Sequence, residues 1–497
     1  MERNLDRRQF ILAAGAAAGS LLADPTTVAA DTPSPEDRPN IVFILIDDLG
    51  WKDVGYHDSR LYETPNVDRL ARSGMRFSDA YAACPVCSPT RASIMSGKYP
   101  ARLNQTDWIP GKELRTERKF KQLQDLNYLP LDEVTVAEAL KSAGYTTCHI
   151  GKWHLGGKQH MPSDQGFDIN ICGNRAGSPP GYFAPFPRQG PGWKELNEDA
   201  EKGDYLPDLL ARRATSFIRE HQDEPFFLYL SHFDVHTPRQ AKDRYKELYR
   251  KKMEAMGQPS GPAHRDEKYN ATTKLHQDNE IYAGMVQSMD ESVGRVLNTL
   301  EGAGLREDTV VVFMSDNGGL STLPHHSAST SNEPLRAGKG WCYEGGIREP
   351  CIISYPRRVE PMSFSSEPVI STDFYPTMLD LAGLPLRPDQ HQDGLSLVPL
   401  LEDGYELDRE ALYWHYPHYH GSNARPHGAM RKGKWKLLEF YEDMSVELYN
   451  LEKDISEKHD LSGEMPEKTA ELRKQFHRWR ERVDAQMPKP NPDYQAG

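Results

Sequence analysis

Two long apolar runs in this sequence end in the same way, in a short cluster of acidic, amide and glycine residues. Residues 41–46 are entirely apolar and are followed by Asp-Asp at positions 47–48. Residues 309–314 are similarly apolar, and Asp-Asn follows at positions 316–317. A continuous apolar run of this length favours a β-strand buried on both faces, as in a parallel sheet. The sequence therefore predicts at least two buried strands that end in oxygen-bearing side chains.

Two further predicted strands also end in ionisable side chains. Residues 145–150 lead into Lys152 and His154, and residues 225–230 lead towards His236. In open α/β sheets, ligands bind beyond the carboxyl ends of the strands. Four strands that carry Asp, Asn, Lys and His to this edge therefore predict a single site.

Helical segments separate these strands. Residues 65–74 begin with a proline and end at a glycine, and residues 135–144 begin with the Thr-x-x-Glu spacing of a capping box. Residues 281–300 carry apolar side chains on one helical face. Strands that alternate with helices favour an α/β fold, with a large, mainly parallel sheet sandwiched between helices.

The pattern changes near residue 405. Residues 430–438 and 446–449 are typical of paired antiparallel strands around a turn, and a charged amphipathic helix is predicted over about residues 466–483. We therefore expect a main domain over residues 31–405 and a smaller C-terminal α+β subdomain, with an antiparallel sheet, over residues 406–497.

The first thirty residues have the features of an export signal. Paired arginines at 7–8 precede an alanine-rich apolar run, and small residues occupy positions 28–30. This order is typical of a cleavable signal peptide, and the paired arginines are typical of the twin-arginine pathway. The run is shorter than the about 20 residues that span a bilayer. We therefore expect the export machinery as a partner, a periplasmic or secreted protein, and no stable membrane span.

The overall charge restricts the partners. With 73 acidic and 60 basic residues, the formal net charge is -13. Proteins that bind a nucleic-acid backbone usually carry the opposite balance, so no nucleic acid is expected as a partner. An anionic substrate must be attracted by a local cluster of positive side chains, against the field of the whole protein.

A loop with two cysteines allows three interpretations. Cys84 and Cys87 have the C-x-x-C spacing of a redox pair, which is also the spacing of half a zinc site. The surrounding sequence lacks the pattern of a small βαβ redox domain, and it lacks a second Cys or His pair for zinc. The third interpretation uses only Cys87, together with Pro89 and Arg91.

The segment from Cys87 to Arg91 resembles the C-x-P-x-R signature of the type I sulfatases, in which the cysteine is oxidised to formylglycine. This family, which includes arylsulfatases and N-acetylgalactosamine sulfatases, belongs to the alkaline phosphatase superfamily. The other motifs that resemble this family are, in sequence order, Asp47-Asp48, Gly151-Lys152-Trp153-His154, His236-Thr237-Pro238, Asp316-Asn317-Gly318, Lys339-Gly340 and Glu344-Gly345-Gly346-Ile347-Arg348. The resemblance covers about residues 38–483 and implies an alkaline-phosphatase-like fold, with residues 31–405 as its catalytic domain.

The resemblance implies a sulfuric ester hydrolase whose Cys87 is converted to formylglycine (3-oxoalanine) by a maturation enzyme. One hydroxyl of the hydrated aldehyde would attack sulfur, and loss of a proton from the other would then expel sulfate. Lys152 and Lys339 would hold the sulfate oxygens, and His154 would take that proton. His236, with Lys339, would protonate the leaving alcohol. The implied catalytic residues are Cys87, Arg91, Lys152, His154, His236 and Lys339.

The implied metal site uses hard oxygen ligands. With an oxygen of the modified Cys87 and one of sulfate, they would form a calcium-like shell of about six oxygens, and magnesium is the alternative. Taken singly, Asp-Asp and Asp-Asn are also common turn residues. A zinc pair of the phosphatase type would need more histidines near these acids. The protein ligands expected are Asp47, Asp48, Cys87, Asp316 and Asn317.

The side chains expected to contact the alcohol part of the substrate come from loops rich in His and aromatic residues. Such loops suit a sugar ring, although they are as typical of a packed surface between domains. The candidates are Asn174, His325, His326, His418, His420 and Arg425, with Ser178 as an alternative to Asn174. Together with export, they favour an exo-acting carbohydrate sulfatase on sulfated galactose or N-acetylgalactosamine of polysaccharides.

Two other functions compete with this hypothesis. A phosphatase or phosphodiesterase of the same superfamily is favoured if Cys87 stays unmodified. A non-catalytic protein that binds sulfated glycans is the other alternative. The complete set of Lys152, His154, His236 and Lys339 argues against the non-catalytic protein.

Overall fold

The computed structural model describes residues 38–111, 118–187, 193–324 and 328–495. The predicted export signal at residues 1–30 and the predicted substrate residues His325 and His326 lie outside these ranges. All of the described residues belong to one compact unit. Within the described ranges, the largest sheet has nine strands in the order β11-β2-β10-β8-β1-β5-β3-β4, with β12 paired to β2.

The strands of this sheet come from most of the chain before residue 371. Their bounds are β1 Asn40–Ile46, β2 Met75–Tyr81, β3 Thr146–Gly151, β4 Ile169–Ile171, β5 Phe226–Ser231, β8 Thr309–Ser315, β10 Arg348–Ser354, β11 Ser363–Ser365 and β12 Val369–Ile370. Strand β10 is antiparallel to β2 and β8, and the other neighbouring strands are parallel. The prediction of a large, mainly parallel sheet is confirmed.

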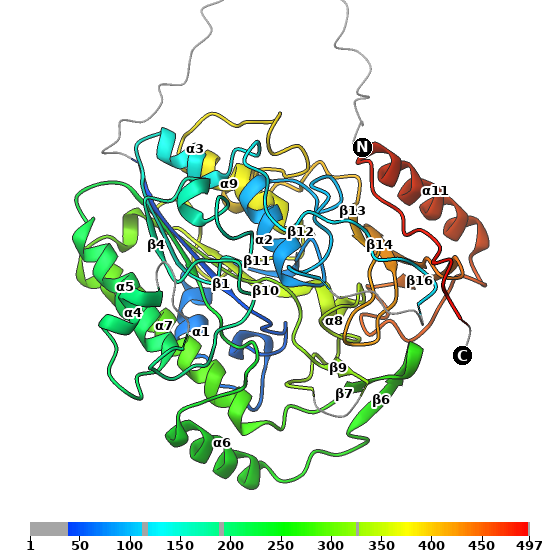
Figure 1. Cartoon of the computed structure of the whole chain (residues 1–497), viewed down its shortest axis with the longest axis horizontal. Helices are drawn as coiled ribbons and strands as arrows, with labels where there is room; N and C mark the ends of the chain where they lie inside the picture. Colours follow the sequence, from blue (N-terminus) through cyan, green and yellow to red (C-terminus); the bar gives the residue numbers. More distant parts are fainter. Residues whose placement is uncertain (1–37, 112–117, 188–192, 325–327, 496–497) are drawn as a thin grey trace, which may run out of the picture. The chain divides into compact units, whose positions relative to one another are not determined.

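The central strands β1, β5 and β8 are buried along their whole length because they are largely apolar. Val42, Ile44 and Ile46 of β1 belong to one buried cluster, whereas Phe43 and Leu45 belong to another. Helices α1, α5 and α7 pack on the first face, and α2, α3, α9 and α10 on the second (Figure 1). This layered arrangement is the one expected for an α/β fold.

The helices begin and end close to where the sequence places them. Helix α3 has the predicted capping box, in which the side chains of Thr135 and Glu138 each accept a backbone N–H. The helix bounds are α1 Pro65–Arg72, α2 Cys87–Ser96, α3 Val136–Ser142, α4 Trp193–Glu198, α5 Leu206–Glu220, α6 Asp243–Met256, α7 Glu280–Gly302, α8 Glu344–Ile347, α9 Phe374–Leu381, α10 Val398–Asp403 and α11 Pro466–Arg482. None of the helices in the described residues is long and apolar enough to cross a membrane.

The C-terminal part contains the predicted antiparallel sheet. Strands β13 (Leu412–Tyr416), β14 (His427–Lys432), β15 (Trp435–Phe440) and β16 (Ser445–Asn450) pair in sequence order, and α11 packs against them (Figure 1). A third, small sheet is formed by β6 (His264–Glu267), β7 (Ala271–Lys274) and β9 (Thr322–Leu323). We retain a domain boundary at residue 405 as a proposal.

The register of the central strands aligns their carboxyl ends. On β1, Ile46 lies opposite Ser315 of β8, and Leu45 lies opposite Ser231 of β5. On β5, Ser231 also lies opposite Gly151 of β3. The loops that follow β1, β3, β5 and β8 therefore start at the same level of the sheet edge.

Candidate active site

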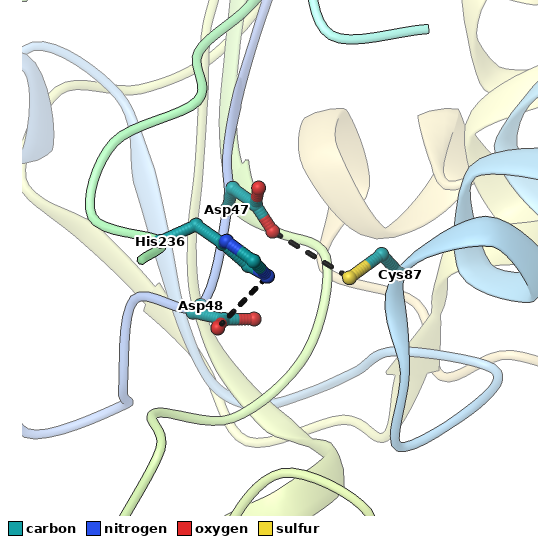
Figure 2. A group of neighbouring side chains, drawn as sticks. All are labelled: Asp47, Asp48, Cys87 and His236. Carbon is teal, nitrogen blue, oxygen red and sulfur yellow. Dashed lines mark hydrogen bonds and ion pairs between the residues drawn. The ribbon is translucent and has the colours of Figure 1, made fainter. Parts of the chain in front are cut away.

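The loops at this edge bring together side chains from distant parts of the chain. Helix α2 starts there with Cys87, because β2 runs parallel to β8 and ends at the same edge. Figure 2 shows Cys87 facing two acidic residues that follow β1 and His236 from the loop after β5. The thiol Sγ lies 3.6 Å from Oδ1 of Asp47. The group whose candidate ligand atoms all lie within 4.8 Å of one another is Asp47, Asp48, Cys87 and His236.

Each carboxylate of the predicted metal site contacts one buried cation. The three carboxylates and the three cations that they contact are nearly inaccessible to water, so each charge needs a partner of opposite sign. The three pairs are Asp47–Lys152 (2.7 Å), Asp48–Lys339 (2.5 Å) and Asp316–Arg91 (2.7 Å). The protein residues of the site are therefore close to formal neutrality.

The electrostatic environment differs between Asp47 and Asp48, the two aspartates that follow β1. Burial raises the pKa of Asp47 from 3.8 to about 7, although Lys152 opposes this shift. Burial also raises the pKa of Asp48, but Lys339 and His236 outweigh it, so that the net pKa lies well below the usual range. Burial lowers the pKa of Lys339, but its interactions with Asp48 and Cys87 outweigh burial, so the pKa of Lys339 is raised overall. Lys339 therefore keeps its proton.

Cys87 is a weak nucleophile as a thiol. Its side chain is 2% exposed, and Nζ of Lys339 lies 3.2 Å from its Sγ. Burial raises the pKa of this thiol to about 12, with Lys152 and Lys339 opposing the shift. At neutral pH the thiol stays protonated, and a protonated thiol is neither a good nucleophile nor a good metal ligand.

Cys84 faces away from this group. Its thiol donates a hydrogen bond to the carbonyl oxygen of Thr106, at 3.7 Å, and both Cys84 and Cys87 are free thiols. The redox-pair interpretation is therefore not supported by the structure. The other described cysteines, Cys148, Cys172, Cys342 and Cys351, are also buried and free of disulfides.

Arg91 lies one helical turn after Cys87 in α2, and its guanidinium group contacts residues at the ends of the central strands. Nε donates to Asp316 at 2.8 Å, and Nη1 donates to the carbonyl oxygen of Lys152 at 2.8 Å. Nη1 also donates to the hydroxyl of Ser231. Arg91 therefore joins α2 to the ends of β3, β5 and β8. These contacts orient Asp316 and Lys152.

The two histidines are held by backbone carbonyls. Nε2 of His154 donates to the carbonyl oxygen of Ile109 at 2.6 Å, and its buried Nδ1 has no hydrogen-bond partner among the described residues. His236 contacts the carbonyl oxygen of Thr237 through Nδ1, at 2.7 Å, and its Nε2 lies 3.8 Å from Asp48. Burial lowers the pKa of both rings, that of His236 to about 3, so both are neutral here.

The donor set fits a hard divalent cation. Nδ2 of Asn317 donates to Asp48 at 2.8 Å, and the buried Oδ1 of Asn317 has no hydrogen-bond partner within the described ranges. The backbone N–H of Asp48 donates to Oδ1 of Asp316 at 3.2 Å. An unsatisfied buried amide oxygen beside three carboxylates is the chemistry that Ca²⁺ or Mg²⁺ prefers.

A cavity of about 1300 Å³ opens onto Cys87. His154, His236 and Lys339 line it, together with His420 from the C-terminal part. Asn174 and Ser178 also line it, as the sequence suggests. The Asn174 amide is used within its own loop, however, because it bonds the backbone of Cys172 and Ala176.

Two predicted substrate residues do not line this cavity, which corrects the prediction. His418 is buried, and its Nε2 lies 2.7 Å from Oγ1 of Thr106 and 3.2 Å from Asp125. Arg425 pairs with Glu442 and stacks 4.2 Å above the ring of Tyr269. Histidine and arginine at these positions satisfy buried or interfacial partners, a role that the local sequence does not distinguish from ligand binding.

Sequence reasoning missed several residues of the cavity. Trp108, Ile109, Lys158 and Arg175 line it, and the carbonyl of Ile109 orients His154. These residues lie in loops without regular secondary structure. The sequence signals near these loops were Trp108, two residues before Pro110, and the prolines at 179–180.

Comparison with known proteins places the chain in a family. Residues 39–384 match the sulfatase family, and residues 337–486 match the C-terminal family of N-sulphoglucosamine sulphohydrolase. The protein therefore belongs to the sulfatase family and is a sulfuric ester hydrolase. This confirms the resemblance found in the sequence.

Individual relatives support the assignment over most of the chain. A sulfatase of Formosa agariphila is 32% identical, over 90% of this chain and 88% of the relative. The N-acetylgalactosamine-6-sulfatase of Rattus norvegicus is 32% identical, over 78% and 70%. Arylsulfatase A of Homo sapiens is 31% identical, over 87% and 85%.

Solved structures confirm the alkaline-phosphatase-like fold. Ps i-CgsB, in complex with k-i-k-neocarrahexaose, superposes with a TM-score of 0.71 and 31% identity, over 91% of this chain and 94% of the other. The phosphonate monoester hydrolase of Agrobacterium radiobacter has the same fold, with a TM-score of 0.64 and 20% identity over 90% of this chain and 96% of the other.

Proposed function

We propose that this sulfatase hydrolyses sulfate monoesters of carbohydrates with a formylglycine made from Cys87 and with a bound Ca²⁺. The observation that carries the proposal is the position of Cys87. It is a buried, protonated thiol at the start of α2, between Asp47 and Lys339. A thiol in this environment is unreactive, whereas a hydrated aldehyde would supply a hydroxyl nucleophile at the same place.

The cation would be held by Asp47, Asp48, Asp316 and Asn317, with an oxygen of the modified Cys87. Because three cations already balance the three carboxylates, a divalent ion would give the site an excess of positive charge. That excess would attract an anionic sulfate ester into a protein whose formal net charge is -13. When bound, the ion would stabilise negative charge on the ester oxygens.

The side chains around Cys87 suit the proton transfers of ester hydrolysis. Lys339 keeps its proton and lies beside Cys87, so it can hold a sulfate oxygen and share in protonating the leaving alcohol. His236 is neutral, but a bound sulfate would add negative charge beside it and raise its pKa. The unpartnered Nδ1 of neutral His154 is an acceptor that could take a proton. Lys152, paired with Asp47, would hold another sulfate oxygen.

The relatives and the size of the cavity support a sulfated carbohydrate as the substrate. The relatives include an N-acetylgalactosamine-6-sulfatase, and Ps i-CgsB was solved with a neocarrahexaose. We therefore propose an exo-acting enzyme on sulfated galactose or N-acetylgalactosamine of polysaccharides. We also propose export through the paired arginines at 7–8, which would bring the enzyme to such polymers outside the cytoplasm.

Two measurements on active wild-type protein test this proposal. Mass spectrometry of the peptide that contains residue 87 should find an aldehyde in place of the thiol. Sulfate release should be detected from galactose or N-acetylgalactosamine that carries a single sulfate at position 4 or 6. A free thiol in fully active protein would reject the formylglycine mechanism and favour phosphatase chemistry. Activity on aryl sulfates alone would reject the carbohydrate substrate.

Removing the divalent cation should make stability depend on pH through Asp47. The unfolded carboxyl ionises near its model value of 3.8, but burial holds the folded pKa at about 7. The metal-free folded state therefore binds the extra proton and loses stability as the pH rises through this window. A cation that binds the ionised carboxylate offsets this loss. The increase in Tm on adding Ca²⁺ should therefore be small at about pH 5 and larger at about pH 7.5.

Melting curves of EDTA-treated protein, with and without Ca²⁺ or Mg²⁺, measure this effect. The Asp47→Asn variant is the control, because its side chain does not titrate and should remove most of the pH-dependent part of the increase. An increase in Tm of the same size at both pH values in the wild type would contradict the role of Asp47.

A further inference from the structure

Two cationic side chains on the wall of the active-site cavity have no partner among the residues that the structure describes. Lys158 and Arg175 both line the cavity and are exposed. Neither makes a hydrogen bond or an ion pair with another residue in the part of the chain that the structure describes. By contrast, Lys152 and Lys339 of the site are each paired with an aspartate.

The two cations lie on adjoining segments. A Cβ atom placed on Gly157 would lie 3.5 Å from the Cβ of Arg175, so the loop that carries Lys158 packs against the one that carries Arg175. Asp164 is the acidic residue that lines the same cavity away from the metal site, and its carboxylate accepts the backbone N–H of Met161 at 2.9 Å. The wall formed by these two loops therefore has an excess of positive charge.

The cavity has room for more than the sulfated sugar. Its volume of about 1300 Å³ exceeds the about 300–1,000 Å³ of a pocket that encloses a drug-sized ligand. Trp108, another lining residue, offers an aromatic surface on which a sugar ring can pack. A sulfate held at Cys87 therefore leaves space for at least one further sugar unit.

We propose that Lys158 and Arg175 form a second anion subsite for the substrate. It would bind a sulfate or carboxylate group on the sugar unit next to the one that loses its sulfate. The planar guanidinium of Arg175 matches either anion in a bidentate geometry, and Lys158 adds a point charge. This inference rests on the proposed function, and it narrows the substrate to glycans that carry acidic groups on neighbouring units.

The test uses disaccharides that share a terminal galactose with one sulfate, at position 4 or 6. Their second unit is glucose, glucuronic acid or glucose 6-sulfate. Binding is measured by calorimetry to the Cys87→Ala variant, so that no turnover is needed. An anionic second unit should lower Kd by about tenfold relative to glucose, the effect of about one strong charged contact. The glucuronate and sulfate arms show which anion is preferred.

The tighter binding of disaccharides with an anionic second unit should disappear when Arg175→Gln and Lys158→Gln are both added to the Cys87→Ala protein. Arg250→Gln is the matched control, because Arg250 is an exposed arginine on α6 outside the cavity, and it should keep the full preference. Melting temperatures confirm that each variant is folded. A preference that survives in the Arg175→Gln and Lys158→Gln protein overturns the inference, as does a panel without any preference for the anionic unit.

Turnover by the wild type separates this result from the proposed function. Sulfate release from the disaccharides without any preference in binding would overturn the subsite alone. A preference that depends on Arg175, without sulfate release from any of the disaccharides, would support the subsite and count against the proposed reaction.

Discussion

Replacing Cys87 by alanine should abolish sulfate release while the protein stays folded. The side chain is small and lies at the start of α2 beside the cavity, so its truncation removes little packing. If residue 87 becomes the nucleophile, no other side chain can supply the covalent step, and kcat/KM should fall by at least about 10⁴-fold. The measurement is kcat/KM on 4-nitrophenyl sulfate and on a sulfated galactose, with circular dichroism to verify folding.

Cys84→Ala is the matched control for this variant. Cys84 lies three residues earlier in the same loop and is equally buried, but its thiol faces Thr106. We expect this variant to keep most of its activity. If a folded Cys84→Ala protein were as inactive as Cys87→Ala, the redox-pair interpretation of the two cysteines would be supported. An active Cys87→Ala protein would exclude residue 87 from the mechanism.

Lys339→Ala should cause the second largest loss, about 10³-fold in kcat/KM, comparable to the removal of one donor that stabilises transition-state charge. Its Nζ contacts both Asp48, at 2.5 Å, and the Sγ of Cys87, at 3.2 Å. If Lys339 helps to protonate the leaving alcohol, the loss should be larger on a sulfated sugar than on 4-nitrophenyl sulfate, because nitrophenolate leaves without a proton.

Lys98→Ala provides the control for the loss of a partly buried lysine. Lys98 pairs with Glu133 at 2.7 Å and does not line the cavity, so its removal should leave kcat/KM unchanged. Equal losses on the sugar and on the nitrophenyl ester in Lys339→Ala would show that Lys339 only holds the sulfate. Near wild-type turnover in that variant would exclude it from the reaction.

The fold was predictable because continuous apolar runs indicate strands that are buried on both faces. The apolar runs at residues 41–46 and 309–314 became neighbouring parallel strands, and the Thr-x-x-Glu spacing became the cap of α3. The antiparallel direction of β10 was not predictable, since an apolar strand has the same composition in either direction.

The site was predictable only in part. The order of the motifs, through their resemblance to the sulfatases, predicted that Cys87 and the residues that follow the strands share one site, and the structure brings them together. The same reasoning placed His418 and Arg425 in the substrate pocket, whereas the structure gives both of them other partners. Whether a polar side chain binds a ligand or satisfies a buried neighbour depends on contacts with distant residues, which local sequence does not specify.

By itself, the sequence determined the layered sheet and the acidic ends of two strands, because both follow from local pattern and spacing. The role proposed for Cys87 came instead from the resemblance of its motif to the sulfatase family. Only the tertiary structure decided which cation faces which carboxylate and that Cys84 turns away. It also decided that Lys158 and Arg175, on one wall of the cavity, have no partner in the described parts of the chain. Those features depend on strand register and loop packing, which join residues that lie more than a hundred positions apart, such as Lys152 and Asp47.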